Sequence, residues 1–177
     1  MRNLKILFGL IILFLVHSSL LFAQKSSKIT STCVSGDCEN GIGKQKFSNN
    51  ATYEGAFKDD LPHGKGKYVS DEYTYIGDFA GSTKEGNGEL WKKDGSFYKG
   101  QFLRNKFEGK GKLQDAYGIY EGDFLEGKKH GKGMNTYANE IYIGEWKNDL
   151  KDGVGKLTDL KGKIIQQGTW KEGKFLR

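Results

Sequence analysis

Large aromatic and small residues recur with a fixed spacing through the chain from about residue 41 to residue 170. The pattern Tyr-x-Gly-x-Phe/Trp begins at Tyr53, Tyr75, Tyr98, Tyr120 and Tyr142, so that successive units lie 22 or 23 residues apart. In every unit a Gly-x-Gly pair begins seven residues after the aromatic that closes the pattern. Agreement in phase over five units indicates an internal repeat.

The alternation inside each unit is typical of β-strands. Tyr, Gly and Phe/Trp at every second position share one face of an extended strand, and the glycines of Gly-x-Gly share a face with the residue two further on. Turn sequences such as SNNA at 48, KDGS at 93 and LKGK at 160 separate these strands and predict β-hairpins. We expect a loop between one hairpin and the next, for example over Leu125–His130, and we expect Pro62 in such a loop.

A glycine between two large aromatics leaves a notch that a ring from the neighbouring hairpin can fill. Each unit would then expose apolar surface that only its neighbours can cover, as in a solenoid. Five to six hairpins would give about 10 to 12 strands in an elongated, twisted, single-layer antiparallel sheet, an all-β fold. The residues predicted to build this scaffold are Tyr53, Gly55, Phe57, Gly64, Gly66, Tyr75, Gly77, Phe79, Gly86, Gly88, Tyr98, Gly100, Phe102, Gly109, Gly111, Tyr120, Gly122, Phe124, Gly131, Gly133, Tyr142, Gly144, Trp146, Gly153 and Gly155.

These units resemble the MORN (membrane occupation and recognition nexus) repeat family, whose units of about 23 residues follow Tyr-x-Gly-x-Trp and then Gly-x-Gly. The resemblance extends from about Gly41 to Trp170 and implies a β-hairpin array with about five full repeats in residues 41–177. The chain departs from the pattern at both ends. Gln166 stands where a Tyr is expected, and no Tyr-Gly-aromatic strand precedes Gly41, so the ends are interpreted as caps.

The first 23 residues differ from the rest. Arg2 and Lys5 precede an apolar run that ends in Ala23, which predicts a helical secretory signal peptide over residues 1–23. The alternative is an uncleaved membrane anchor, because the apolar run is just long enough to span a bilayer. We interpret residues 24–40 as a linker and N-terminal cap. In an exported chain, Cys33 and Cys38 are expected to form a local disulfide, with two free thiols as the alternative.

Composition and net charge indicate the kind of core and the classes of partner to expect. Nine Tyr and three Trp, all after residue 23, indicate an aromatic-rich core in a chain otherwise poor in large aliphatic residues. The formal net charge of +6 falls to about +4 without Arg2 and Lys5. This excess is mild, and we expect no nucleic-acid partner.

The candidate chemical sites do not meet the requirements of their motifs. Residues 122–128 contain Gly-x4-Gly-Lys, but Lys129 stands where a P-loop needs Ser or Thr, and a strand rather than a helix is predicted to follow. His63 and His130 precede Gly-Lys-Gly three units apart, so we interpret them as loop residues that bond to backbone. We therefore expect no catalytic residue, no cofactor and no metal site. A hydrolase hidden in the repeats has no supporting constellation.

Charged residues fill the face opposite the aromatics. Carboxylates at Glu54, Asp78, Glu121, Asp123 and Glu145 are predicted to pair across strands with lysines of the Gly-x-Gly strands, namely Lys65, Lys67, Lys110, Lys112, Lys132 and Lys156. Such pairing makes a solvated face with a weak net field. Contact with anionic lipid is therefore expected to be weak.

The sequence predicts a non-catalytic, exported protein, periplasmic or extracellular, or membrane-anchored if the signal is retained. Its role would be that of a scaffold that binds another protein, with a second copy of itself as one candidate partner. The alternative is a peripheral binder of anionic lipid or glycan at the cell envelope. Trp91 and Trp170 are the candidate partner contacts, because Trp brings a large area and one polar handle to an interface.

Overall fold

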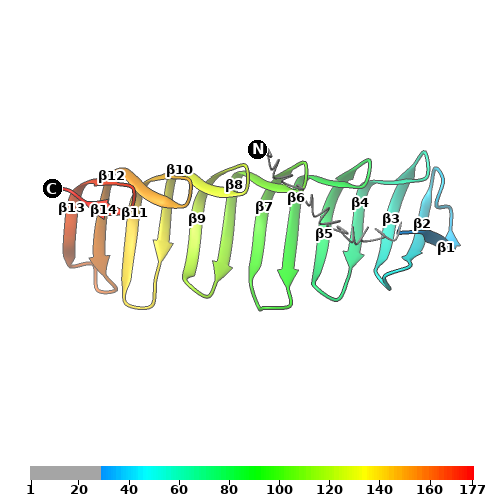
Figure 1. Ribbon diagram of the computed structural model, residues 1–177, viewed down its shortest axis with the longest axis horizontal. Coiled ribbons are helices and arrows are strands. Elements are labelled where there is room, and N and C mark those ends of the chain that lie inside the picture. The colour runs from blue at the N-terminus through cyan, green and yellow to red at the C-terminus, as the bar shows by residue number, and fades with distance from the viewer. Residues whose placement is uncertain (1–28) are drawn as a thin grey trace, which may run out of the picture.

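The computed structural model describes residues 29–177, so the predicted signal peptide helix (1–23) and its cleavage lie outside the described residues. These residues form one antiparallel sheet in which fourteen strands pair in chain order (Figure 1). The strands are β1 (Ser31–Gly36), β2 (Ile42–Phe47), β3 (Thr52–Lys58), β4 (Leu61–Val69), β5 (Tyr73–Ala80), β6 (Thr83–Lys92), β7 (Phe97–Leu103), β8 (Lys106–Asp115), β9 (Gly118–Leu125), β10 (Lys128–Thr136), β11 (Glu140–Lys147), β12 (Leu150–Asp159), β13 (Ile164–Lys171) and β14 (Lys174–Phe175).

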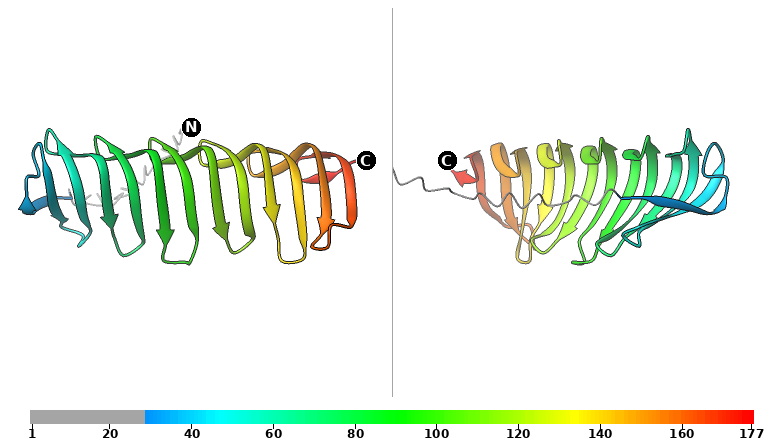
Figure 2. Two further views of the ribbon diagram at one scale, coloured as in Figure 1. Left: turned by 180° about the vertical axis from the view of Figure 1, so that it is seen from behind. Right: turned by 45° about the vertical axis from the view of Figure 1, so that its right-hand side comes forward.

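The predicted elongated single layer of consecutive hairpins is confirmed, as the three views show (Figures 1 and 2). The number of strands exceeds the predicted 10 to 12 because the sheet extends past both ends of the repeat pattern. Strand β1 lies in the segment predicted as a linker and pairs with β2. Cys33 in β1 bonds to Cys38 in the β1–β2 connection, which is the predicted disulfide, and the two sulfurs are 2.07 Å apart.

The sequence predicted a loop after each Tyr-x-Gly-x-Phe/Trp strand, and this prediction is wrong because a two-residue turn stands there. In the stretch predicted as the loop Leu125–His130, β9 ends at Leu125, the turn consists of Glu126 and Gly127, and β10 begins at Lys128. Both turn residues have positive φ, which is the geometry of tight hairpins with the right-handed twist of the strands. Similar two-residue turns with positive φ recur at 59–60, 81–82, 104–105, 148–149 and 172–173.

Pro62 also lies in a strand rather than in a loop. It is the second residue of β4, is buried, and pairs with Phe57 beside a register shift in the β3–β4 ladder. A proline is tolerated there because a strand start and a bulge leave its missing amide without a ladder partner.

The first glycine of each Gly-x-Gly is required by backbone conformation. Gly64, Gly86, Gly109 and Gly131 have φ between +56° and +62°, and Gly153 has φ of +111°. Each lies at a bulge where the ladder to the preceding strand shifts register. The hairpin ends that carry the tight turns bend out of the sheet at one side (Figures 1 and 2).

The second glycine of each pair is required by space. A Cβ built on Gly111 would lie 2.5 Å from the hydroxyl oxygen of Tyr98, which is closer than real Cβ atoms approach. In the ladder, Gly111 pairs with the central glycines of β7 and β9, and this pairing continues across the sheet. The resulting glycine line contains Gly36, Gly43, Gly55, Gly66, Gly77, Gly88, Gly100, Gly111, Gly122, Gly133, Gly144, Gly155 and Gly168.

The core is a row of aromatic rings on one face, which we call the aromatic face. Each tyrosine touches the Phe or Trp of its own unit and that of the next unit edge to face, with centroids 4.9–5.2 Å apart. The tyrosine hydroxyl donates to the carbonyl three residues on, as in Tyr98 to Gln101 at 2.9 Å. The row is continuous from Phe57 to Trp170, so each unit completes the core of its neighbour.

Candidate interaction surfaces

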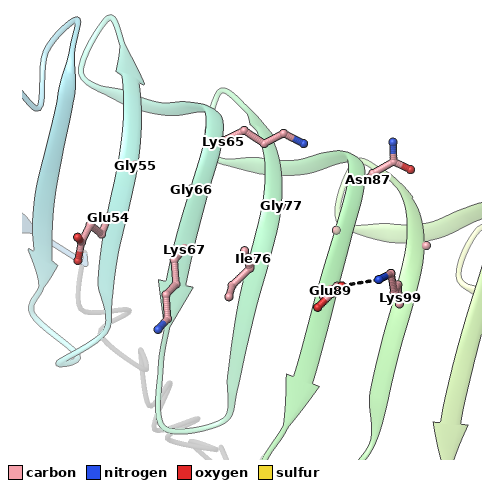
Figure 3. Close-up of a pocket in the computed structure, with 12 residues that line it drawn as sticks. Glu54, Gly55, Lys65, Gly66, Lys67, Ile76, Gly77, Asn87, Glu89 and Lys99 are labelled. Atoms are coloured by element: carbon pink, nitrogen blue, oxygen red, sulfur yellow. Dashed lines mark ion pairs between the residues drawn. The ribbon is translucent and has the colours of Figure 1, made fainter.

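The face opposite the aromatic rings has a shallow groove that follows the glycine line. Alternation directs the glycine positions toward the aromatic face and the residues on either side of them toward this face, so the glycine backbone forms the floor and those side chains form the walls. One section, with a volume of about 730 Å³, crosses β3 to β7 (Figure 3). A second section of about 450 Å³ is lined by residues from β8 to β12. We call the two sections together the glycine groove.

Ion pairs cross between neighbouring strands along the walls of the groove. The predicted cross-strand pairing is found for Lys65–Asp78, Lys110–Asp123 and Lys112–Glu121. The other lysines of the predicted set form no ion pair within residues 29–177, namely Lys67, Lys132 and Lys156. Lys99 and Glu89 form a further pair with 2.9 Å between the charged atoms, marked in Figure 3. Exposed pairs of this kind contribute at most about 1 kcal/mol each. Their main consequence is that most of the charge on this face is neutralised locally.

Three of the acidic residues have a second role that the sequence reasoning missed. The Asp123 carboxylate accepts the backbone N–H of Lys132, in the bulge of the next strand, at 3.0 Å. Asp78 and Glu145 do the same for the corresponding residues of their units. Burial alone would raise the pKa of Asp123, but the bonds from Lys110 and from the Lys132 amide outweigh it and lower that pKa. The signal was an acid three residues after the repeat tyrosine.

Apolar side chains stand among these charges. Ile76 lines the first section of the groove, and Ile143 and Val154 line the second. All three are exposed, Ile143 with half of its surface accessible. The groove therefore offers charged hydrogen-bonding groups together with a few apolar contact points.

The aromatic face is more closed. The five repeat tyrosines are at most 1% exposed, and burial raises their pKa values, to about 12 for Tyr53 and Tyr142. Lysines reach over some of these rings. Lys129 lies 5.1 Å from the Tyr120 centroid and donates to Asn135 at 2.7 Å. Burial lowers the pKa of this lysine.

The two tryptophans predicted as partner contacts differ. Trp170 is 2% exposed and packs against Tyr142 and Phe175, so it is a core residue, and its prediction as a surface contact is wrong for the chain alone. It was misassigned because β14, which covers it, has no repeat pattern. Trp91 is 37% exposed at the far end of β6 beside Phe97, and its role as a partner contact stays a prediction.

The histidines lie in strands and not in loops. His63 belongs to β4 and is exposed, and His130 belongs to β10 and is partly buried. His130 Nδ1 has no hydrogen-bond partner among residues 29–177. Over the same residues, His, Cys, Asp and Glu side chains form no group of three that could hold a metal ion.

Comparison with known families agrees with this architecture. The sequence profile of the MORN repeat matches residues 53–73, 75–97, 98–116, 120–140 and 142–162, which together make up more than half of the chain. The chain therefore belongs to the MORN repeat family. A search of curated proteins found no match.

Membership defines the class of protein. MORN repeats are generally protein- or lipid-binding modules and are typically not catalytic. No helix in residues 29–177 has the length and apolar character needed to span a bilayer.

Proposed function

We propose that this chain is an exported, non-catalytic interaction module that holds an extended segment of another protein in the glycine groove. The observation that carries this function is the groove along the glycine line, whose two sections are lined by residues from β3 to β12. Most of the groove crosses interior strands that are hydrogen-bonded on both sides. Little conformational freedom would be lost on binding, which favours affinity.

The walls of the groove indicate the chemistry of the segment. Charges of both signs alternate along it, and Ile76, Ile143 and Val154 supply apolar contacts. A segment with interspersed acidic, basic and aliphatic residues would match this surface. Because the charges are largely paired, salt would weaken such binding only modestly.

Export is supported by two observations. The apolar segment at the start of the sequence resembles a signal peptide, and Cys33 and Cys38 are bonded in the structure. Disulfides persist mainly in oxidising compartments such as the periplasm or the cell exterior.

Cross-linked affinity capture from the native cell envelope tests this function, using two matched variants. Ile143→Glu places a charge in the groove, whereas Ile165→Glu places one at a similarly exposed site, 52% against 50%, that does not line the groove. We expect the wild-type chain and Ile165→Glu to capture the same protein and Ile143→Glu to lose it. Capture that is equal for both variants would exclude the groove as the binding site.

A peripheral lipid binder is the second candidate, because Lys67, Lys132 and Lys156 form no ion pair within residues 29–177 and lie on the same face. Sedimentation with anionic phospholipid vesicles at low and high salt tests it. Binding that salt abolishes and that Ile143→Glu leaves intact would favour the lipid over the protein partner. A panel of envelope glycans tests the corresponding sugar alternative.

Self-association is a further expectation. Within residues 29–177, strand β1 pairs with β2 alone and all six of its residues are exposed, so its outer edge offers free backbone groups to a further strand. A second copy of the chain could extend the sheet there. Size-exclusion chromatography with light scattering would show a mass that rises from one chain to two with concentration, and a constant mass of one chain would exclude it.

A further inference from the structure

A small hollow lies on the aromatic face near the N-terminal end of the sheet. Its volume is about 230 Å³. Six ring side chains form its floor and walls, namely Phe47, Tyr53, Pro62, Tyr68, Tyr73 and Phe79. The volume is below the roughly 300 to 1,000 Å³ typical of pockets for drug-sized ligands. A ligand with one ring and a small substituent is therefore the size that fits.

The hollow exists because the first unit differs from the others at one position. In the other four units, the residue two positions before Gly-x-Gly reaches over the tyrosine of that unit: Lys84 over Tyr75, Phe107 over Tyr98, Lys129 over Tyr120 and Lys151 over Tyr142. Pro62 occupies this position in the first unit. Within residues 29–177, Tyr53 has no cation and no stacked ring over its face, and the space is left open.

One wall of the hollow carries a cation without a counterion. The Lys84 ammonium lies 3.3 Å from the Tyr73 hydroxyl and 4.6 Å from the centre of that ring. No carboxylate in residues 29–177 forms an ion pair with this ammonium group. The nearby Glu72 carboxylate contributes to the raised pKa of Tyr73. Burial lowers the pKa of Lys84, which reflects the cost of keeping a charge there without a partner.

Asn105 stands beside this cation at the rim. Its side-chain oxygen accepts the backbone N–H of Lys84 at 2.8 Å, which fixes the amide. The amide NH2 group has no acceptor among residues 29–177 and can donate to a ligand. A cation and an amide donor together favour a carboxylate, and the surrounding ring faces and edges favour a flat, apolar ring.

We propose that this hollow binds a small aromatic carboxylate, with its ring between Phe47, Tyr68 and Tyr73 and its carboxylate on Lys84 and Asn105. The ligand would take the place over Tyr53 that a lysine or phenylalanine side chain takes over the other repeat tyrosines. This site lies on the face opposite the glycine groove and does not depend on the function proposed for that groove.

Isothermal titration of the purified full chain with benzoate tests the site. We expect one benzoate per chain, and binding at least about tenfold weaker for benzamide, which lacks the charge, and for acetate, which lacks the ring. Glucuronate carries a carboxylate on a saturated, hydroxyl-rich ring and is expected to bind more weakly than benzoate. Tighter binding of glucuronate would overturn the assignment of an aromatic ligand, and no benzoate binding would overturn the site.

Variants locate the binding. Pro62→Phe copies the residue of the third unit and should fill the hollow, and Lys84→Met should remove the cation, each weakening benzoate at least about tenfold. Lys129→Met, the same substitution at the same position two units later, should leave benzoate binding unchanged. Lys84→Arg keeps the charge and should retain binding, which separates loss of the cation from loss of folding. Wild-type affinity in Pro62→Phe would show that benzoate binds elsewhere.

Discussion

The two faces of this sheet are built from alternate residues of the same strands, yet they differ in every property that matters for stability and binding. On the aromatic face, rings from adjacent units interlock at 4.9–5.2 Å and exclude water. On the grooved face, charges pair with one another and remain exposed. The glycine line serves the aromatic face directly, because a Cβ at these positions would collide with the tyrosine rings, and its backbone forms the floor of the groove on the other face. One face holds the array together, and the other is free to vary.

Alkaline pH should act on the aromatic face most strongly. Burial raises the pKa of Tyr53 and Tyr142 to about 12 from 10.0, so above pH 10 the unfolded chain loses protons that the folded chain retains, and stability falls as pH rises from 10 to 12. Lys84, Lys129 and Lys151 act in the opposite direction. Their lowered pKa values mean that the unfolded chain binds more protons below its lysine pKa of 10.5, so their contribution rises with pH up to that value.

Tyrosinate absorbance and far-ultraviolet circular dichroism, recorded together across this pH range, measure the alkaline effect. We expect the repeat tyrosines to ionise as the sheet unfolds. Gradual ionisation of all the tyrosines with an intact sheet would contradict the buried ring row.

Removing one ring from the row should have the next largest effect. Tyr98 touches Phe102, Phe107 and Phe124, so Tyr98→Ala should lower the free energy of unfolding by about 3–5 kcal/mol. Tyr117→Ala is the matched control, since this tyrosine is 78% exposed, and should cost less than about 0.5 kcal/mol. Urea unfolding measures both, and equal costs would mean that the row is not the core.

Adding a single methyl group to the glycine line should come next. The Cβ of Gly100→Ala would lie 2.6 Å from the Gly111 Cα, where backbone cannot move away easily, and we expect a cost of about 2–3 kcal/mol. Gly95→Ala is the control, because its Cβ meets nothing within 4 Å although its φ of +85° is unfavourable, and it should cost about 1 kcal/mol. A smaller loss of unfolding free energy for Gly100→Ala than for Gly95→Ala would show that the glycine line can accommodate a methyl group.

The smallest effects should come from the grooved face, where they separate two roles of one ion pair. Lys110→Ala removes only an exposed partner of Asp123 and should cost less than about 1 kcal/mol. Asp123→Ala also leaves the Lys132 amide in the bulge without its acceptor and should cost about 1–2 kcal/mol. Chemical denaturation of both variants and of the double variant tests this order. An equal cost for the two single variants would mean that the bulge bond contributes nothing.

Much of the fold could be predicted from the spacing of the residues, because the same strand pattern recurs in five units. The positions of Tyr98, Gly100 and Phe102 on one face follow from alternation alone. The two-residue turns could not be predicted from the sequence, because pairs such as Arg104–Asn105 lack the Asn-Gly or Asp-Gly signature. Their surroundings hold them at positive φ. Asn105, for example, bonds to the backbone of Lys84 one unit earlier.

The candidate sites were less predictable than the fold. The ion pairs on the grooved face could be predicted, since facing positions carry opposite charges. The groove itself could not, because it arises from the alignment of glycines from consecutive strands into one row. The hollow beside Lys84 was also missed, because it depends on Pro62 being short where other units have a long side chain.

By itself, the sequence determined the repeat, the alternation of faces, the family and the local disulfide, because each rests on the spacing of nearby residues or on short-range contacts. Only the tertiary structure decided which surfaces remain open. Trp170 was predicted as a partner contact, but Phe175 of β14 packs against it and it is buried. Whether a ring is covered, a lysine unpaired or the groove continuous depends on how neighbouring strands pair and pack, which the spacing of residues within one unit does not fix.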